Sequence, residues 1–468
     1  MSSKREQILI IGAGLCGSLL ALRLGQRGYQ VRVIEMRPDL RKTDISAGRS
    51  INLAFSNRGL KAMKMVGIDH KVKELCIPMH GRMLHDRQGH TKLSKYSGRD
   101  GEYINSISRE LLTALLMDEA EALENVTIEF NNKCNNVDFE NNIANFTNTE
   151  NSQVFDCKAD IIFGTDGAGS ALRKSYFSEH QFLFSFSQNF LTHGYKELTI
   201  PPTDKGEFRT FKNALHIWPR GEFMIIALPN LDGSFTVTLF LAYQGGNYNF
   251  NNLKSKEAVI NFFEKEFPDA LKLMPNLAKE FFNNPTAPLG TIKCYPWQYH
   301  GKNILLGDAA HAIVPFYGQG MNASFEDVVE LDTCLDQYNG DWKQTFETFQ
   351  RKRKIDTDGI ADLAIDNFHE MKNHVASPTF QKKRALEMCL ETEFPTDYFS
   401  KYSMVTFRED MGYFEAMTKG RAQDKAILNM INDNDIDPNL PMALVLKKIN
   451  QQTQSILEED EIAKTMHH

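Results

Sequence analysis

A glycine-rich turn between two apolar strands near the start of the chain constrains its fold most. Apolar residues at 8–11 lead into a GxGxxG turn, a helical run follows, and a second apolar strand at 31–34 ends on Glu35. This succession of strand, turn, helix, strand and acid is typical of a βαβ dinucleotide-binding unit. A signal peptide is a weaker interpretation, because the apolar run continues into a second strand and no small-residue cleavage site follows it.

Each part of this motif has a physical reason. Gly12 allows the tight turn after the strand, Gly14 lets backbone N–H groups approach a pyrophosphate, and Gly17 lets the helix pack closely on the strand. The phosphates would then lie at the helix N-terminus. Glu35 is placed to accept hydrogen bonds from a ribose 2′-OH, which favours FAD or NAD over NADP in this unit.

Composition and charge exclude several classes of protein. The chain has 468 residues, of which 42% are hydrophobic and 24% charged, so we expect two or more globular units. A net charge of −7 argues against nucleic acid as a partner. The seven cysteines are scattered and never form CxxC, which predicts reduced thiols and no metal site. No stretch of about 18 apolar residues occurs, so we expect a cytoplasmic protein without a membrane anchor.

The middle of the chain predicts an antiparallel sheet. Three apolar runs, at 214–218, 223–228 and 234–240, are separated by short turns that contain glycine. Period two places Met224, Ile226 and Leu228 on one face, which is either a covered core or the wall of a pocket. Helices are expected after this sheet, with breaks at prolines, and again from about residue 336 onward.

Two further turns have the character of ligand-binding loops. A strand at 159–164 ends in a glycine turn with Asp166, and a strand at 303–306 ends in Gly307 and Asp308. The second is followed by a loop rich in Gly and Pro and by a helix that begins near Asn322. Such a helix start presents free N–H groups and a positive dipole end, which suits an anion or an electron-rich ring.

Three polar residues allow both a structural and a functional interpretation. Arg82, in a short strand, is either a solvated charge or a site residue. Arg109, in the first turn of a helix that Ser108 caps, is either a surface residue or a phosphate or ribose contact. Asn367 lies on the inward stripe of a helix, where a buried amide needs a partner. That partner is a substrate or a neighbouring helix or loop.

The three turns, in this order and at these separations, resemble the FAD fingerprints of single-component aromatic hydroxylases. Longer strings resemble the kynurenine 3-monooxygenase family along nearly the whole chain. These include Gly48-Arg-Ser-Ile-Asn-Leu-Ala, His80-Gly-Arg-Met, His193-Gly-Tyr-Lys-Glu-Leu, Ala214-Leu-His-Ile-Trp-Pro, Pro315-Phe-Tyr-Gly-Gln-Gly-Met-Asn and Lys401-Tyr-Ser-Met-Val-Thr-Phe. One departure is Tyr317, where members of that family often carry His.

The resemblance implies roles for individual residues. A tight, non-covalent FAD would be held by Gly12, Gly14, Leu15, Gly17, Glu35, Arg37, Ala54, Arg109, Asp166, Gly307, Asp308, Gly320, Met321 and Asn322. The substrate carboxylate would be held by Arg82, Tyr96, Asn367 and Tyr402. An apolar wall would consist of Leu215, Met224, Ile226, Leu228 and Phe240, and the loop Pro315, Phe316 and Tyr317 would lie over the flavin.

The implied fold is α/β, with a Rossmann-type FAD-binding domain, an antiparallel-sheet substrate domain and a C-terminal helical unit. The FAD-binding parts would be 1–75, 105–185 and 291–335, the substrate-domain parts 76–104 and 186–290, and the helical unit 336–468. A monomer or homodimer is expected.

The implied reaction is hydroxylation of L-kynurenine to 3-hydroxykynurenine, with NADPH and O₂ as co-substrates and a flavin hydroperoxide as the oxygen donor. The aniline ring is already electron-rich, so no residue is assigned as an acid or a base. Two alternatives are an FAD hydroxylase of another aromatic carboxylate and a non-catalytic FAD-binding redox scaffold.

Overall fold

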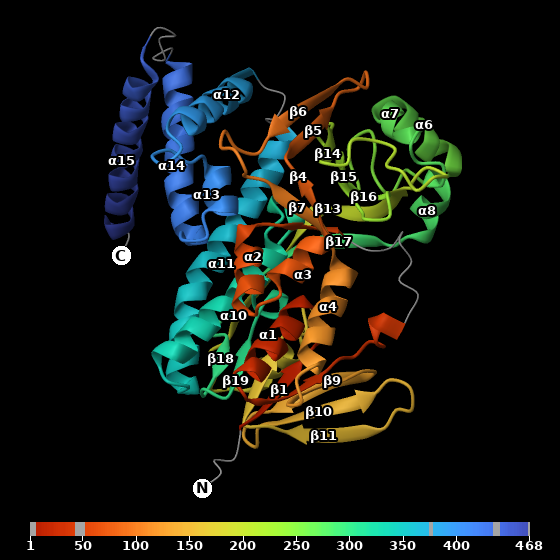
Figure 1. Ribbon diagram of the computed structural model, residues 1–468, viewed down its shortest axis with the longest axis vertical. Helices are drawn as coiled ribbons and strands as arrows, with labels where there is room; N and C mark the ends of the chain where they lie inside the picture. The colour runs from red at the N-terminus through yellow and green to blue at the C-terminus, as the bar shows by residue number, and fades with distance from the viewer. Residues whose placement is uncertain (1–5, 43–51, 374–377, 434–439, 467–468) are drawn as a thin grey trace.

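A computed structural model describes residues 6–42, 52–373, 378–433 and 440–466. Residues 48–51 of one family string lie outside these ranges. A nucleotide-binding region forms the lower part of the molecule in Figure 1, a large sheet the upper right, and a layer of helices the left side. The expected α/β fold with a C-terminal helical unit is therefore confirmed.

A six-stranded sheet, ordered β18-β19-β12-β1-β2-β8, forms the base of the molecule. Every pairing is parallel except that of β18 with β19. The strands are β1 (Gln7–Ile11), β2 (Gln30–Ile34), β8 (Val126–Glu129), β12 (Ile161–Gly164), β18 (Gln298–Tyr299) and β19 (Asn303–Leu305). The helices around it include α1 (Leu15–Gln26), α4 (Arg109–Glu121), α5 (Ala171–Ser175), α9 (Asp308–His311) and α10 (Gly320–Gln337). The predicted strand–turn–helix–strand motif is confirmed, and so is the Ser108 cap of α4, whose side chain accepts from the Leu111 N–H.

Two small antiparallel sheets adjoin this region. One contains β3 (Asn52–Phe55), β7 (Ile104–Ser108) and β4 (Cys76–Met79), and the helices α2 (Asn57–Met65) and α3 (Asp69–Glu74) lie between β3 and β4 on the chain. The other contains β9 (Asn132–Asp138), β10 (Ile143–Asn148) and β11 (Val154–Lys158). β4 pairs with β7, not with the large sheet. The stretch 76–104, expected as substrate-domain strands, therefore divides between two sheets.

The large sheet has the order β17-β13-β16-β15-β14-β5-β6. Its strands are β5 (Gly81–His85), β6 (Thr91–Lys95), β13 (Ser185–Ile200), β14 (Leu215–Pro219), β15 (Met224–Pro229), β16 (Phe235–Ala242) and β17 (Thr286–Tyr295). The meander of β14, β15 and β16 is antiparallel, as predicted. The pairing of β14 with β5 is parallel, and the two strands come from distant parts of the chain.

The two faces of this sheet have different neighbours. Phe223, Ile225 and Ala227 face a core with the helices α6 (Lys256–Glu266), α7 (Pro268–Leu271) and α8 (Leu277–Asn283). The alternate residues Met224 and Leu228 belong to other clusters, formed with the C-terminal helices and the loops. The period-two prediction for β15 is therefore confirmed.

The remaining helices form the left side of Figure 1. They are α11 (Trp342–Asn373), α12 (Pro378–Glu393), α13 (Lys401–Phe407), α14 (Tyr413–Asn432) and α15 (Met442–Met466). The long helix α11 contacts α10 in the nucleotide-binding region, β17 of the large sheet and α14. It thus connects the three parts of the molecule. Over the described ranges, we find no helix with both the length and the apolar character needed to cross a membrane.

A buried histidine pair joins the parallel strands β5 and β14. His85 Nε2 lies 2.8 Å from His216 Nδ1, His85 Nδ1 lies 2.7 Å from Asp269, and His216 Nε2 lies 2.7 Å from the Phe211 carbonyl oxygen. The carbonyl can only accept, so His216 Nε2 carries a proton and Nδ1 accepts from His85. Burial lowers the pKa of His216 to about 4.

This pair predicts acid sensitivity. The pKa of His216 is about 4 in the folded chain and about 6.5 in the unfolded chain, so the unfolded chain binds more protons between these values. Lowering the pH from 7 to 5 should therefore reduce the free energy of unfolding, with about 2 kcal/mol of the reduction due to His216. Denaturant unfolding at several pH values measures this slope, and His216→Gln should flatten it. An unchanged slope in that variant would assign the acid sensitivity to other groups.

Candidate functional site

The three glycines of the first turn have different surroundings. Gly12 has φ +101°, and a Cβ there would lie 2.8 Å from the Thr165 carbonyl oxygen. A Cβ at Gly17 would lie 2.0 Å from the Gly12 carbonyl oxygen. A Cβ at Gly14 would meet nothing within 4 Å. The fold itself requires Gly12 and Gly17, whereas Gly14 borders open space that a ligand can enter.

The N-terminus of α1 is built to receive an anion. It begins at Leu15, and the first N–H groups of a helix have no partner within the helix. Neither a side-chain cap nor an acidic residue of the first turn occupies them here. Glu35 is 4% exposed and supports the turn, because it accepts from the Ala13 N–H (2.8 Å) and from Arg37 Nε (2.8 Å). A ribose contact of Glu35 would be additional to these bonds.

A second helix start, that of α10, also lacks a side-chain cap and an acid in its first turn. It contains Gly320, Met321 and Asn322. The side chain of Asn322 is fully committed within the protein, since Nδ2 donates to the Ala54 carbonyl (2.9 Å) and Oδ1 accepts from the Ser56 N–H (3.0 Å). Asn322 therefore fixes β3 beside α10, and the backbone N–H groups are what this helix start offers to a ligand.

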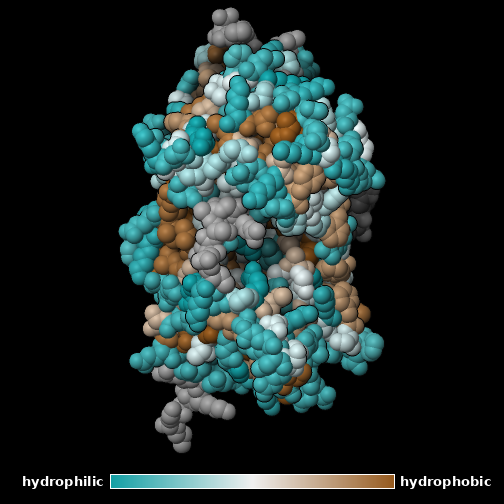
Figure 2. Space-filling model, turned by 90° about the vertical axis from the view of Figure 1, so that its right-hand side faces the viewer, coloured by the Kyte–Doolittle hydropathy of each residue, from teal (hydrophilic) through white to brown (hydrophobic). Residues whose placement is uncertain are grey.

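The other predicted cofactor residues lie at the starts of further helices or in the turns before them. Asp166 accepts from the Ala171 N–H (2.6 Å), and burial raises its pKa. Its Oδ1 atom is buried and has no hydrogen-bond partner in the described part of the chain. Gly307 has φ +59° and precedes Asp308, which is exposed at the start of α9. Arg109 is exposed at the start of α4. Seen from the side of the large sheet, the surface is hollowed at mid-height (Figure 2).

A cavity of about 430 Å³ lies between the large sheet and the C-terminal helices. Arg82 of β5, Tyr96 just after β6, Asn367 of α11 and Tyr402 of α13 all line it, together with Tyr317. The structure thus brings together all four residues predicted to hold a carboxylate. A volume of this size is usual for a small-molecule site.

Arg82 lies beside two phenols, Tyr96 and Tyr402, whose rings stack on each other with their centres 5.4 Å apart. Its guanidinium carbon is 4.7 Å from the centre of the Tyr402 ring and 5.6 Å from that of Tyr96. No carboxylate among the described residues forms an ion pair with Arg82. Burial opposes its charge, but the surrounding phenols and Glu370 outweigh burial, so its pKa is raised and it stays a cation.

The two phenols remain neutral hydrogen-bond donors. Burial raises the pKa of both Tyr96 and Tyr402. The Tyr96 hydroxyl is buried and lacks a hydrogen-bond partner within the ranges the structure describes. A half-buried cation without an ion pair and an unsatisfied phenol beside it together favour an anionic ligand.

The five residues expected as an apolar wall lie behind the cavity, not in its lining. Met224 and Phe240 pack with Phe316, whose ring centre is 5.0 Å from that of Phe240. Leu215, Ile226 and Leu228 pack in the cluster that contains Tyr96 and Tyr402. They support the loop and the phenols from the sheet side. Period two placed Met224, Ile226 and Leu228 on one face, and the family resemblance added Leu215 and Phe240.

Asn367 contacts the loop at 315–317. Its Nδ2 donates to the Phe316 carbonyl (2.6 Å), so the loop is one partner of this amide. Tyr317 lines the cavity, and its ring stacks on Tyr402 with the ring centres 5.7 Å apart. Asn367 therefore couples the cavity to the loop, in agreement with the loop-partner interpretation of the sequence.

The sequence interpretation missed a set of charged residues at the cavity. Glu370 lies one turn after Asn367 on α11, so helical spacing could have identified it. Lys383 and Lys401 both contact Asp424, at 2.7 and 2.6 Å. These three residues come from α12, α13 and α14, whose association no local pattern indicates.

The family described as FAD binding domain matches residues 5–355 of this chain. Kynurenine 3-monooxygenase of Myxococcus xanthus is 45% identical over 405 residues, which are 86% of either protein. Kynurenine 3-monooxygenase of Dictyostelium discoideum is 41% identical over 465 residues, 95% of this chain and 99% of that protein.

Solved structures of other oxygenases share the fold. A 2-methyl-3-hydroxypyridine-5-carboxylic acid oxygenase superposes with a TM-score of 0.64 and 20% identity, covering 84% of this chain and 98% of its own. Pseudomonas aeruginosa PqsL, in complex with 2-aminobenzoylacetate, has a TM-score of 0.62 and 16% identity, covering 79% and 97%.

The surroundings of the glycines predict a contrast between two variants. Gly17→Ala should lower the free energy of unfolding by about 3 kcal/mol or more, because its Cβ would collide with backbone atoms. Gly14→Ala, at an ordinary φ of −72°, should change it by less than about 1 kcal/mol. Denaturant unfolding of the ligand-free protein measures both. Equal losses in the two variants would contradict the different roles assigned to these glycines.

Proposed function

This chain belongs to the kynurenine 3-monooxygenase family, and from that premise we propose roles for the residues of its site. The chain is an FAD-dependent, NADPH-consuming monooxygenase that hydroxylates L-kynurenine to 3-hydroxykynurenine. We assign FAD contacts to the residues around the helix starts and carboxylate contacts to residues of the cavity, and the arrangement of both supports these roles.

The residues at the nucleotide-binding end fit FAD. Open space at Gly14 and the uncapped start of α1 suit a pyrophosphate, and Glu35 and Arg37 suit the adenosine ribose. The remaining contacts would come from Gly12, Leu15, Gly17, Ala54, Arg109, Asp166, Gly307, Asp308, Gly320, Met321 and Asn322. When bound there, FAD would supply the hydride-accepting and O₂ chemistry of the reaction.

The cavity beside Arg82 would hold the kynurenine carboxylate. The observation that carries this proposal is the guanidinium of Arg82, which lines the cavity without a carboxylate partner among the described residues. Two parallel N–H donors of an arginine bind and orient a carboxylate. The neutral hydroxyls of Tyr96 and Tyr402 would donate to the same group, and Asn367 would add a further contact.

The chain would contribute to the reaction by orienting the substrate and by excluding water from the site. The amino group already makes the kynurenine ring electron-rich, so no side chain needs to remove a proton before oxygen transfer. The loop Pro315, Phe316 and Tyr317 would close the site above the flavin, with Phe316 packed on Phe240 and Tyr317 on Tyr402. Excluding water there protects a reactive oxygen donor.

NADPH oxidation by the purified holoprotein, with and without L-kynurenine, tests the function. Kynurenine should accelerate NADPH oxidation and yield 3-hydroxykynurenine, identified by mass and by ring-proton NMR. If kynurenine had no effect but another aromatic carboxylate gained oxygen, the chain would be a hydroxylase of that compound. If NADPH did not reduce the bound flavin in the presence of any aromatic acid, the redox scaffold would be favoured.

Replacing Arg82 tests the carboxylate site. Arg82→Lys keeps a cation but loses the two-pronged contact, so the KM for kynurenine should rise by about 10- to 100-fold, equivalent to one charge-assisted hydrogen bond. Steady-state kinetics with product analysis measure this change. The matched control is Arg32→Lys, which should leave KM unchanged. Arg32 forms a partly exposed ion pair with Glu129 of β8, the edge strand of the six-stranded sheet. Equal KM values in both variants would refute the carboxylate role.

The cytoplasmic location and the state of a monomer or homodimer stay predictions from the sequence. Cell fractionation and light scattering test them.

A further inference from the structure

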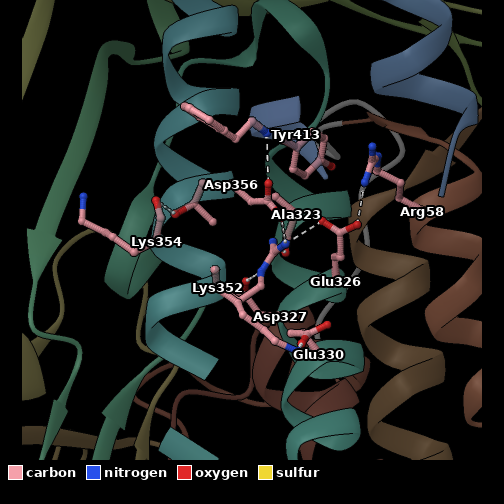
Figure 3. Close-up of polar contacts among 12 residues, drawn as sticks. Arg58, Ala323, Glu326, Asp327, Glu330, Lys352, Lys354, Asp356 and Tyr413 are labelled. Carbon is pink, nitrogen blue, oxygen red and sulfur yellow. Dashed lines mark hydrogen bonds and ion pairs between the residues drawn. The ribbon is translucent and has the colours of Figure 1, made fainter. Parts of the chain in front are cut away.

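A buried network of charged side chains connects the nucleotide-binding loops with the helix that carries Tyr402 (Figure 3). Its members are Arg58 of α2, Glu326 and Asp327 of α10, and Arg353 of α11. Glu326 lies at the centre, because Arg58 Nη1 donates to Oε1 (2.6 Å) and Arg353 Nη1 donates to Oε2 (2.8 Å). The cavity lining contains none of these four residues.

Arg58 binds the C-terminal end of α13. Its side chain is 0% exposed, Nε donates to the Val405 carbonyl (2.8 Å), and Nη2 donates to the Met411 carbonyl (2.6 Å). The guanidinium carbon also lies 4.0 Å from the centre of the Tyr413 ring. The last carbonyls of a helix have no partner within it, so Arg58 supplies a donor that α13 lacks.

At its other end the network reaches the loop that contains Gly307. Arg353 Nε donates to Asp327 Oδ1 (2.8 Å), and Asp327 Oδ2 accepts from the Gly307 N–H (2.9 Å) and contacts His311 Nε2 (2.6 Å). Asp327 is 0% exposed, and the neighbouring His311 and Arg353 hold its pKa below the usual value despite burial. The carboxylate therefore remains ionised and keeps the loop and α11 together.

The orientation of α13 sets the place of Tyr402 in the cavity. The helix has seven residues, and Val405 lies one turn after Tyr402. Near its beginning, Ser400 caps the helix by accepting from the Ser403 N–H, and Lys401 binds Asp424 at 2.6 Å. Two side chains of α2 fix the other end to the nucleotide-binding region: Arg58 donates to the Val405 carbonyl, and Asn57 donates to the Phe407 carbonyl (3.4 Å). We propose that Arg58 is a positioning residue, which holds Tyr402 at the distance from the flavin loops that kynurenine requires.

This inference rests on the proposed carboxylate site, and a double-mutant cycle between Arg58 and Tyr402 tests it. The dissociation constant of kynurenine is measured by calorimetry on the FAD-loaded protein for wild type, Arg58→Lys, Tyr402→Phe and the double variant. Tyr402→Phe should weaken binding about tenfold in the wild-type background. In the Arg58→Lys background it should weaken binding by less than about threefold, because Tyr402 is then already displaced.

The matched control is Arg27→Lys. Arg27 joins α1 to α10 through Asp332 and donates to the Asp332 carbonyl, so it resembles Arg58 in chemistry but lies away from α13. Its combination with Tyr402→Phe should give additive effects on binding. Additive effects for Arg58 as well, with a lowered melting temperature only, would show that Arg58 serves stability alone and would overturn the proposal.

A second variant covers the case in which Arg58→Lys does not fold. Glu326→Gln keeps the shape of the central residue but removes the charge that holds the Arg58 guanidinium against the Val405 and Met411 carbonyls. The cycle of Glu326→Gln with Tyr402→Phe should again be non-additive, and additivity there would equally overturn the inference. If wild type bound no kynurenine, the carboxylate site itself would be refuted, an outcome distinct from additivity.

Discussion

The cavity depends on one constraint, the half-buried position of the Arg82 guanidinium without a carboxylate partner in the described chain. Such burial costs free energy unless other groups compensate for it. Tyr96 and Tyr402 provide this compensation through their ring faces, at 5.6 and 4.7 Å from the guanidinium carbon. With Glu370 they outweigh the effect of burial on the pKa of Arg82, and an anionic ligand would supply the carboxylate partner that the described chain lacks. The parallel pairing of β5 with β14, joined by His85 and His216, fixes the strand from which Arg82 projects.

The nucleotide-binding end also presents polar groups without a side-chain partner. The starts of α1 and α10 lack caps and acidic residues, although a cap would stabilise each helix in isolation. Nearby polar side chains are instead used to hold the loops, as Asn322 holds β3 and Glu35 holds the first turn. The network of Arg58, Glu326, Arg353 and Asp327 then connects these loops with α13 through side chains that are almost fully buried.

Local features of the fold could be predicted from the sequence because their causes are local. The GxGxxG turn, the Ser108 cap and the alternating faces of β15 each depend on residues within a few positions of one another. The parallel pairing of β5 with β14 could not be predicted, since the two strands lie more than a hundred residues apart in the sequence. For the site, the family resemblance selected Arg82, Tyr96, Asn367 and Tyr402, and the structure brings them to one cavity. The position of the apolar wall behind Phe316 and the phenols depends on how the loop folds over the sheet.

The central claim is that Arg82 and its phenols recognise a carboxylate beside the flavin. The most direct measurement compares L-kynurenine with kynuramine, which has the same aromatic ketone but no carboxylate, as stimulants of NADPH oxidation by the FAD-loaded protein. Kynuramine should fail to accelerate oxidation at concentrations at which L-kynurenine saturates the protein. Equal stimulation by the two compounds, with equal yields of hydroxylated product, would contradict the account.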